Sequence, residues 1–311
     1  MIDYLTKLIH AGKRHKIRSL PHLGIWLWLL LCIPCLLASC GNDDDEKEKG
    51  LSVSLSWANE ADKGTEVKDV KLWIFNAGKD SLVEEKHYGS AEEMASQRFQ
   101  LPEGTYRILT TTNLSEPFFI KEQTRALSSW NNILIGLTNP KDVKNNAYFG
   151  VTDVKIDNKE GNYVVQNPVK SVLAELTIII ENVPKGTEMN GKALDCAGCL
   201  FPTQKNSDGD YGLPGIEPTE VEVPTILSTG STLQSEVIRL MPTIQGSQAS
   251  HIYLRLLLPN ATLLEYDITA PVMKAGGKYE LRFKLEEMQP KIYLESDINN
   301  WKDLNKEVEI K

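Results

Sequence analysis

Cysteine and histidine are scarce in this sequence, and their scarcity limits the chemistry that the chain can perform. Five residues of each type occur among 311, and beyond residue 40 only His87, His251, Cys196 and Cys199 remain. A zinc site takes about four ligands, usually Cys or His, and His is the most frequent general acid or base. The sequence also has no glycine-rich phosphate loop, serine nucleophile elbow or zinc-binding helix motif. We therefore expect no enzyme active site, no metal and no cofactor.

A hydrophobic run long enough to span a bilayer is missing as well. The apolar run over residues 23–37 has 15 residues, fewer than the ~20 that a transmembrane helix needs. Five basic residues precede this run, and Leu37-Ala38-Ser39-Cys40 ends it. A basic head, a short apolar core and small residues before the cut are typical of a secretory signal.

The end of that signal resembles a bacterial lipobox. In a lipobox the cysteine thiol carries a diacylglycerol and becomes the first residue of the mature protein. We therefore predict a signal peptide over residues 1–39 and a lipid on Cys40. Such a lipid anchors stably because each buried methylene contributes about 0.8 kcal/mol. The alternative is an N-terminus that anchors in the membrane without cleavage.

The residues after the lipobox predict a charged tether. Residues 40–50 are polar and carry a run of acidic side chains, so with no apolar surface to bury they should be disordered. The acidic run resembles the surface-export signal of Bacteroidetes lipoproteins; the alternative is a plain solvated linker. The whole sequence has 34 basic and 42 acidic residues, of which five basic and one acidic lie in positions 1–39. The predicted mature chain therefore has 29 basic and 41 acidic residues, a net charge of −12. A chain this acidic has no electrostatic attraction to nucleic acid, so we expect no such partner.

Cys196 and Cys199 form a Cys-x-x-Cys motif. In a cytosolic protein this spacing would suggest redox chemistry. An exported chain reaches an oxidising compartment, which favours a local disulfide. We therefore expect a structural disulfide or a pair of free thiols, with a redox or metal role as the alternative.

Alternation of apolar and polar residues recurs from residue 51 onward. Residues 51–57 and 279–285 each have one apolar face, which indicates half-buried strands. Residues 70–75 are apolar on both faces and predict a more central strand, whereas residues 121–137 predict a short helix or a loop packed on the sheet. Turn signals every 8–12 residues or so are typical of β-sandwiches. We predict an all-β fold with an N-terminal sandwich over residues 51–168 and a C-terminal sandwich over residues 169–311.

One stretch has the spacing of a calcium-binding loop. Asn206, Asp208, Asp210 and Glu217 fall at its first, third, fifth and twelfth positions. Tyr211, however, occupies the sixth position, where the sharp turn of such a loop needs glycine. Because the same composition is common in turns, we expect a solvated turn and no metal.

Several short motifs occur in a distinctive order after the lipobox. They are Val53-Ser54-Leu55-Ser56-Trp57, Val70-Lys71-Leu72-Trp73-Ile74-Phe75-Asn76, Leu101-Pro102-Glu103-Gly104-Thr105-Tyr106, Tyr148-Phe149-Gly150, a strand over residues 169–180, and Gly277-Lys278-Tyr279-Glu280-Leu281-Arg282-Phe283. This order resembles the FimB-type fimbrial anchor and fimbrillin-like lipoproteins of Bacteroidales. The resemblance covers most of the mature chain.

The resemblance implies two transthyretin-like β-sandwich domains and a role in type V pili, whose subunits join by donating a β-strand. It implies fimbrillin-type pilin subunits as partners and a lipid-retaining anchor at the outer membrane. Residues 291–311 are the candidate for an exchanged strand; the alternative is that they complete the second sandwich. In shaft subunits of this kind an N-terminal strand is removed, so loss of residues 51–57 would argue against an anchor.

The competing hypothesis is a surface glycan-binding lipoprotein of a polysaccharide uptake system. That function would need exposed aromatic side chains, and Trp130 and Trp301 are the candidates. Large aromatic side chains are more often buried in the core, and burial of both would count against glycan binding. We therefore predict a structural outer-membrane lipoprotein that serves as an anchor or accessory subunit of a fimbria.

Overall fold

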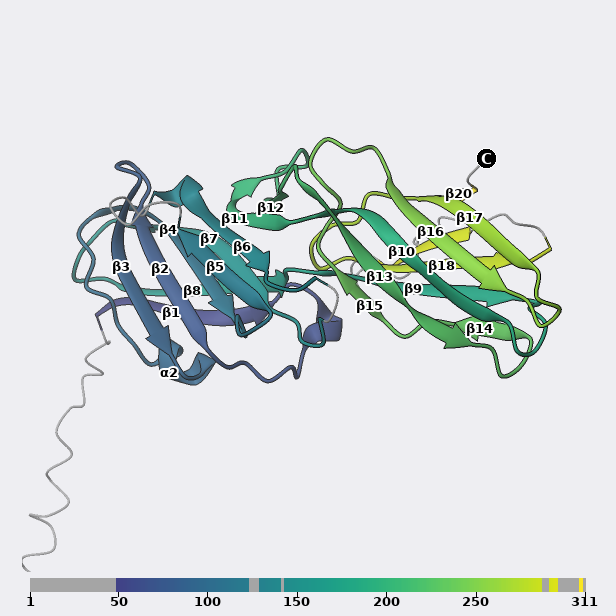
Figure 1. Ribbon diagram of the computed structural model, residues 1–311. Helices are drawn as coiled ribbons and strands as arrows, with labels where there is room; N and C mark the ends of the chain where they lie inside the picture. The colour runs from purple at the N-terminus through teal and green to yellow at the C-terminus, as the bar shows by residue number, and fades with distance from the viewer. Residues whose placement is uncertain (1–48, 123–128, 141–142, 287–290, 296–307, 310–311) are drawn as a thin grey trace, which may run out of the picture. The chain divides into compact units, whose positions relative to one another are not determined.

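The computed structural model describes residues 49–122, 129–140, 143–286, 291–295 and 308–309. These residues form an all-β fold, as predicted, and belong to one compact unit (Figure 1). The described helical segments are short: η1 (Glu60–Asp62), α2 (Ala91–Ala95) and η2 (Trp130–Asn132). In this part of the chain no helix has the length and apolar character needed to cross a membrane.

The strands pair into sheets that we name A to D, and sheets A and B use mainly the first half of the chain. Sheet A has the order β1 (Gly50–Trp57), β8 (Asn162–Ser171), β7 (Tyr148–Ile156), β4 (Gly104–Thr112), β2 (Val70–Asn76) and β3 (Ser81–Tyr88). Sheet B has the order β12 (Tyr211–Pro214), β11 (Cys199–Lys205), β6 (Ile133–Leu137) and β5 (Phe118–Glu122). Both faces of β2 are buried, as its sequence predicts, because Leu72 on one face packs in the core that contains Met94 and Trp73 on the other packs with Trp130.

The two faces of sheet A are covered by different elements. One face packs against α2, with Leu51 and Met94 in the shared core. The other face packs against η2 and sheet B, through Trp73, Trp130 and Ile133. The ambiguous segment of the sequence thus supplies a 3-10 turn and the strand β6 that follows it.

Sheets C and D form a two-layer sandwich. Sheet C has the order β14 (Thr232–Gln234), β9 (Ala174–Glu181), β18 (Lys278–Lys284), β19 (Lys291–Glu295) and β20 (Val308–Glu309), with β15 (Ile238–Leu240) also on β9. Sheet D has the order β13 (Pro218–Leu227), β10 (Glu188–Ala197), β16 (Ser250–Leu257) and β17 (Leu263–Ala270). Their inner faces share one apolar core, with Leu176 and Phe283 from sheet C and Met189 and Leu254 from sheet D.

The sheets do not divide the chain at a single point. β8 keeps residues 169–171 in sheet A, and the Ser171 hydroxyl bonds both the N–H and the carbonyl of Leu173 at 3.0 Å before β9 enters sheet C. The expected single strand over residues 169–180 is therefore two strands. Further on, β10 of sheet D leads through Gly198 into β11 of sheet B. The division of the chain near residue 168 into two domains stays a prediction.

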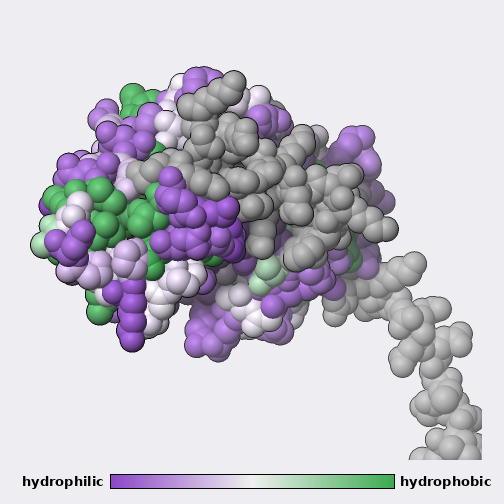
Figure 2. All heavy atoms as spheres, turned by 90° about the vertical axis from the view of Figure 1, so that its right-hand side faces the viewer, coloured by the Kyte–Doolittle hydropathy of each residue, from purple (hydrophilic) through white to green (hydrophobic). Residues whose placement is uncertain are grey.

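An apolar row is exposed at one end of sheet D. Leu227, Leu257 and Leu263 are 61%, 41% and 46% exposed, and the strand register places them in one row in which Glu188 lies between Leu227 and Leu257. Figure 2 shows apolar side chains gathered on the side of the molecule that it presents. Elsewhere the outer face of this sheet carries ion pairs such as that of Arg255 with Glu265. One end of sheet D is therefore mainly apolar on its outer face, whereas the rest of that face is mostly polar.

Candidate functional site

The predicted lipid site lies outside the described residues, so lipidation of Cys40 stays a prediction. The described chain begins at Lys49, whose carbonyl oxygen accepts a hydrogen bond from the Gln100 side chain at 2.8 Å. Gly50 follows with a φ of 104°, in the region that favours glycine, and its backbone lies directly against residues 99 and 100. A tether that ends here leads directly into the first strand.

The N-terminal strand β1 is built into sheet A. It pairs in parallel with β8 along its whole length. On its other side, Leu51 exchanges two backbone hydrogen bonds with Phe99, both at 2.9 Å. Leu51 and Val53 are completely buried in the core that α2 covers. Removing β1 would therefore expose an apolar groove.

The C-terminal strands form one edge of sheet C. β19 pairs with β18 over all five of its residues. β20 pairs with β19 only through Val308 opposite Ile292 and Glu309 opposite Lys291. Among the described residues, the outer side of residues 293–295 has no strand partner. An edge of this kind presents unpaired backbone N–H and C=O groups to another strand.

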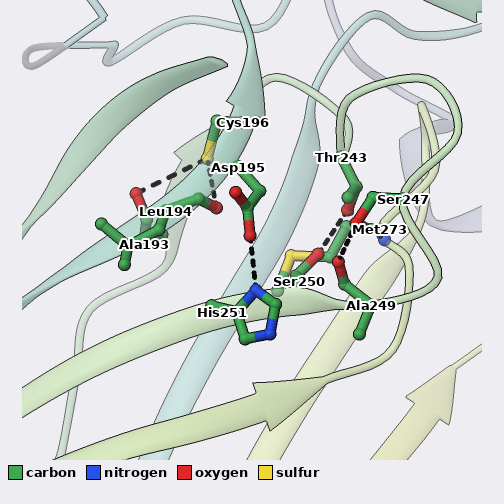
Figure 3. Close-up of polar contacts among 10 residues, drawn as sticks. All are labelled: Ala193, Leu194, Asp195, Cys196, Thr243, Ser247, Ala249, Ser250, His251 and Met273. Atoms are coloured by element: carbon green, nitrogen blue, oxygen red, sulfur yellow. Dashed lines mark hydrogen bonds and ion pairs between the residues drawn. The ribbon is translucent and has the colours of Figure 1, made fainter. Parts of the chain in front are cut away.

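Cys196 and Cys199 are both free thiols, at the junction of β10 and β11. Cys196 lies in the core between sheets C and D, where its thiol donates to the carbonyl oxygens of Ala193 and Leu194 at 3.8 Å (Figure 3). Burial raises the pKa of Cys196 to about 12, and the charge of Asp195 adds to the effect. Burial also raises the pKa of the half-buried Cys199. The disulfide between the two stays a prediction.

Asp195 and His251 lie close to Cys196, but the three do not form a nucleophilic triad. Nδ1 of His251 lies 2.6 Å from Oδ2 of Asp195, on the exposed side of the strands (Figure 3). The Cys196 thiol is bonded instead to carbonyls of its own strand. A catalytic thiol needs a lowered pKa and a nearby base, whereas the pKa of Cys196 is raised. The group is a surface hydrogen-bonded pair beside a core thiol.

Trp130 is part of the core rather than of a ligand platform. It is 2% exposed, and its ring packs edge-on against Phe75 with centroids 5.2 Å apart. The Thr203 hydroxyl bonds its carbonyl oxygen at 2.5 Å. Trp301 lies outside the described residues. One of the two aromatic side chains on which glycan binding would depend is therefore unavailable to a ligand.

The first three residues with calcium-loop spacing lie in the turn between β11 and β12, whereas Glu217 lies beyond β12, just before β13. Oδ1 of Asn206 accepts the backbone N–H groups of Asp208 and Asp210, both at 3.0 Å. The Asp208 carboxylate pairs with Lys274 at 2.7 Å. No group of three or more His, Cys, Asp or Glu side chains in the described residues is arranged to hold a metal ion. Asn206 thus organises a hydrogen-bonded turn.

Comparison with known proteins assigns the family. A family model described as fimbrillin-A associated anchor proteins Mfa1 and Mfa2 matches residues 42–304. The chain belongs to this anchor family. A search of curated protein sequences gives no match.

Solved structures share the fold of this anchor-family chain at low sequence identity. The fimbrial anchor protein Mfa2 from Porphyromonas gingivalis has a TM-score of 0.51 and 12% identity, over 79% of this chain and 96% of that one. A fimbrial assembly protein from Parabacteroides distasonis has a TM-score of 0.50 and 12% identity, over 79% and 94%. A proposed adhesin from Bacteroides thetaiotaomicron has a TM-score of 0.56 and 10% identity, over 79% and 95%. Likeness at such identities shows the fold alone.

Membership of the anchor family sets the broad function of the chain. The family consists of fimbrial anchor proteins that are associated with fimbrillin, which makes this chain a structural protein of the cell surface rather than a catalyst. The resemblance of its motifs to fimbrial anchors is confirmed.

The two thiols should differ sharply in reactivity. With the native protein kept under reductant until iodoacetamide is added at pH 8, we expect Cys199 to be alkylated and Cys196 to stay protected, because its pKa of about 12 leaves almost no thiolate. Peptide mass spectrometry measures both sites. Labelling in urea is the control and should modify both cysteines equally. Equal labelling in the native state would contradict the buried position of Cys196, and a sample without reductant that labels at neither site would reveal the predicted disulfide.

Proposed function

We propose that this anchor-family protein is a lipid-anchored subunit of the outer membrane that holds the base of a fimbria and binds a pilin by β-strand addition. The observation that carries this proposal is the edge of sheet C, where in the described part of the chain β20 covers two of the five residues of β19. The alternative is that the protein is an accessory subunit at another position in the fimbria.

Strand addition suits this edge for physical reasons. An incoming strand gains main-chain hydrogen bonds along the sheet, and alternate side-chain positions fix its register. Among the described residues, displacing β20 breaks the pairing of Val308 and Glu309 with β19, so the incoming strand has few bonds to replace there. At the opposite edge, by contrast, β9 is already paired with both β14 and β15.

The position of β1 supports an anchor rather than a shaft subunit. A shaft subunit of this kind would lose its N-terminal strand to open a groove. Here β1 fills that place along the full length of β8, and its Leu51 is completely buried. A lipid on Cys40 requires the same chain to stay intact, because β1 joins the tether to sheet A.

The lipobox and the tether complete the proposal. Leu37-Ala38-Ser39-Cys40 would direct lipidation, and residues 40–50 would hold the folded part clear of the membrane. We further propose that the two sheet pairs correspond to two transthyretin-like sandwich domains. Support for this comes from the sandwich of sheets C and D and from the packing of sheet B on sheet A.

A disulfide that locks β20 onto β19 should block pilin binding. Ile292 and Val308 are register partners, so Ile292→Cys with Val308→Cys places two thiols opposite each other. We expect the oxidised variant to capture at least tenfold less pilin than the wild type, and reductant to restore capture. Crosslinking of the full-length protein in detergent-solubilised outer membrane, followed by mass spectrometry, measures the captured pilin.

The matched control locks the other edge of the same sheet. Glu181 and Thr232 are register partners on β9 and β14, and their replacement by a cysteine pair should leave capture unchanged. Full capture by the oxidised β19–β20 variant would rule out this edge as the binding site. Partners restricted to a transporter and glycan-binding lipoproteins would replace the fimbrial proposal with the glycan-binding one.

A further inference from the structure

A cavity of about 510 Å³ lies beside the turn between β11 and β12. Its walls are the turn between β11 and β12, the segment 243–248, and the segment 272–275 between β17 and β18. Lys170 of β8 also lines it. The volume is within the range of about 300–1,000 Å³ that is usual for small-molecule sites. The residues of this cavity take no part in the assembly edges described above.

Hydrogen bonds hold the walls of the cavity in place. Thr243 donates its N–H to the carbonyl of Met273 at 2.9 Å, and its hydroxyl accepts the N–H of Met273 at 2.8 Å (Figure 3). The Thr243 hydroxyl also contacts the hydroxyl of Ser250. On the facing wall, Asn206 organises the β11–β12 turn. A ligand would therefore meet a preformed site rather than one that must be ordered on binding.

Lys170 is the distinctive charge of the cavity. Its ammonium lies over the ring of Phe149, 5.4 Å from the centroid. In the described part of the chain it has no hydrogen bond or ion pair, unlike Lys274, which pairs with Asp208. Burial lowers the pKa of Lys170, Lys274 acts in the same direction, and Asp210 opposes both. A partly desolvated cation without a bonded counter-ion favours a bound anion.

The remaining lining groups define what the rest of the ligand must offer. The polar ones are amide and hydroxyl side chains, namely Asn206, Ser207, Gln245, Ser247 and Gln248, and apolar side chains such as Leu213, Ile244 and Val272 line the rest. No aromatic residue lines the cavity in the described part of the chain, so a stacked neutral sugar has no platform. The charged lining residues are three lysines and two aspartates, which leaves an excess of one positive charge on a protein whose net charge is −8. A positive excess in a cleft favours an anionic ligand.

We infer that this cavity binds a small hydroxylated carboxylate of the size of an acidic monosaccharide. Its carboxylate would pair with Lys170, and its hydroxyls would bond the amide and hydroxyl side chains of the walls. The same chemistry is present in a free sugar acid and in the acidic unit of a glycan chain. The site would give this fimbrial protein a ligand-binding function in addition to its structural one.

Titration of the full-length protein in detergent with galacturonate, galactose, digalacturonate and sulfate tests the inference, with binding followed by saturation-transfer NMR. We expect galacturonate to bind at least tenfold more tightly than galactose. Lys170→Met keeps the packing over Phe149 but removes the charge, and should weaken galacturonate binding at least tenfold. Gln245→Ala, which removes one amide of the wall, should weaken it several-fold. Tighter binding of galacturonate would identify a free sugar acid as the ligand. Tighter binding of digalacturonate would identify the acidic unit of a glycan chain.

Lys192→Met is the matched control. Lys192 pairs with Glu220 on the outer face of sheet D, so its loss should not change binding. Circular dichroism confirms that each variant is folded. Equal affinity for galactose and galacturonate, unchanged binding by both cavity variants, or binding of sulfate as tight as that of galacturonate would each overturn the inference.

Discussion

Replacing Val53 by Asp should destabilise the protein by about 4 kcal/mol or more. Val53 is completely buried in the core between β1 and α2, and a carboxylate placed there loses its hydration among apolar side chains. Losses of this size are typical of charges introduced into a core. Urea unfolding of the chain that begins at Cys40, followed by the fluorescence of the buried Trp73 and Trp130, measures the change.

Val164→Asp on the neighbouring strand is the matched control. Val164 is 67% exposed, and an exposed substitution usually changes stability by less than about 0.5 kcal/mol. If Val53→Asp proved as mild as Val164→Asp, β1 would contribute little to sheet A. The strand would then be free to leave, as in a shaft subunit, and the anchor proposal would lose its support from β1.

Replacing Cys40 by Ala should release the protein from the membrane. Without the thiol no thioether can form, so the acyl chains are lost. Each methylene of these chains that is buried in the membrane contributes about 0.8 kcal/mol to anchoring. The charged tether that follows has no apolar surface to compensate. We expect the protein to move from the membrane fraction to the soluble fraction of the cell envelope, as measured by fractionation and immunoblotting, and surface fimbriae to be shed.

Cys199→Ala is the control that distinguishes the loss of the lipid from the loss of any one cysteine. Cys199 is the half-buried first residue of β11, and its replacement should leave the protein in the membrane fraction. Retention of the Cys40→Ala variant in that fraction would show that the N-terminus anchors without cleavage, which is the alternative left open by the sequence.

Local sequence patterns determined which faces of the strands are buried. Residues 70–75, apolar on both faces, and the alternation in residues 279–285 predicted strands, and β2 and β18 lie there, with both faces of β2 buried and with Leu281 and Phe283 of β18 buried. This succeeds because side chains of a strand alternate between its two faces, so burial of one face leaves a period-two pattern in the sequence. The motif order likewise indicated the fimbrial anchor family before any coordinate was considered, and the family match bears it out.

Pattern alone did not reveal the short helix α2. Its five residues carry one fully buried side chain, Met94, which is too little for a helical period to emerge. The segment over residues 121–137 was ambiguous for a related reason: η2 and β6 are only three and five residues long. In both places the helix or strand has too few residues for a periodic pattern of apolar side chains to be recognised.

Strand pairing was decided by tertiary structure alone. Gly50 pairs with Asn162 in the parallel register of β1 on β8, and Cys199 of β11 pairs with Gly136 of β6 in sheet B. Such partners are far apart in the chain. Which strands pair depends on which apolar faces can be covered together, and the sequence of a single strand does not specify its partner. The same holds for the cavity, where Lys170, Asp208 and Lys274 come from three separate segments. The sequence by itself determined the strands and the family and predicted an export signal, whereas the sheet edges and the cavity exist only because distant segments pack together.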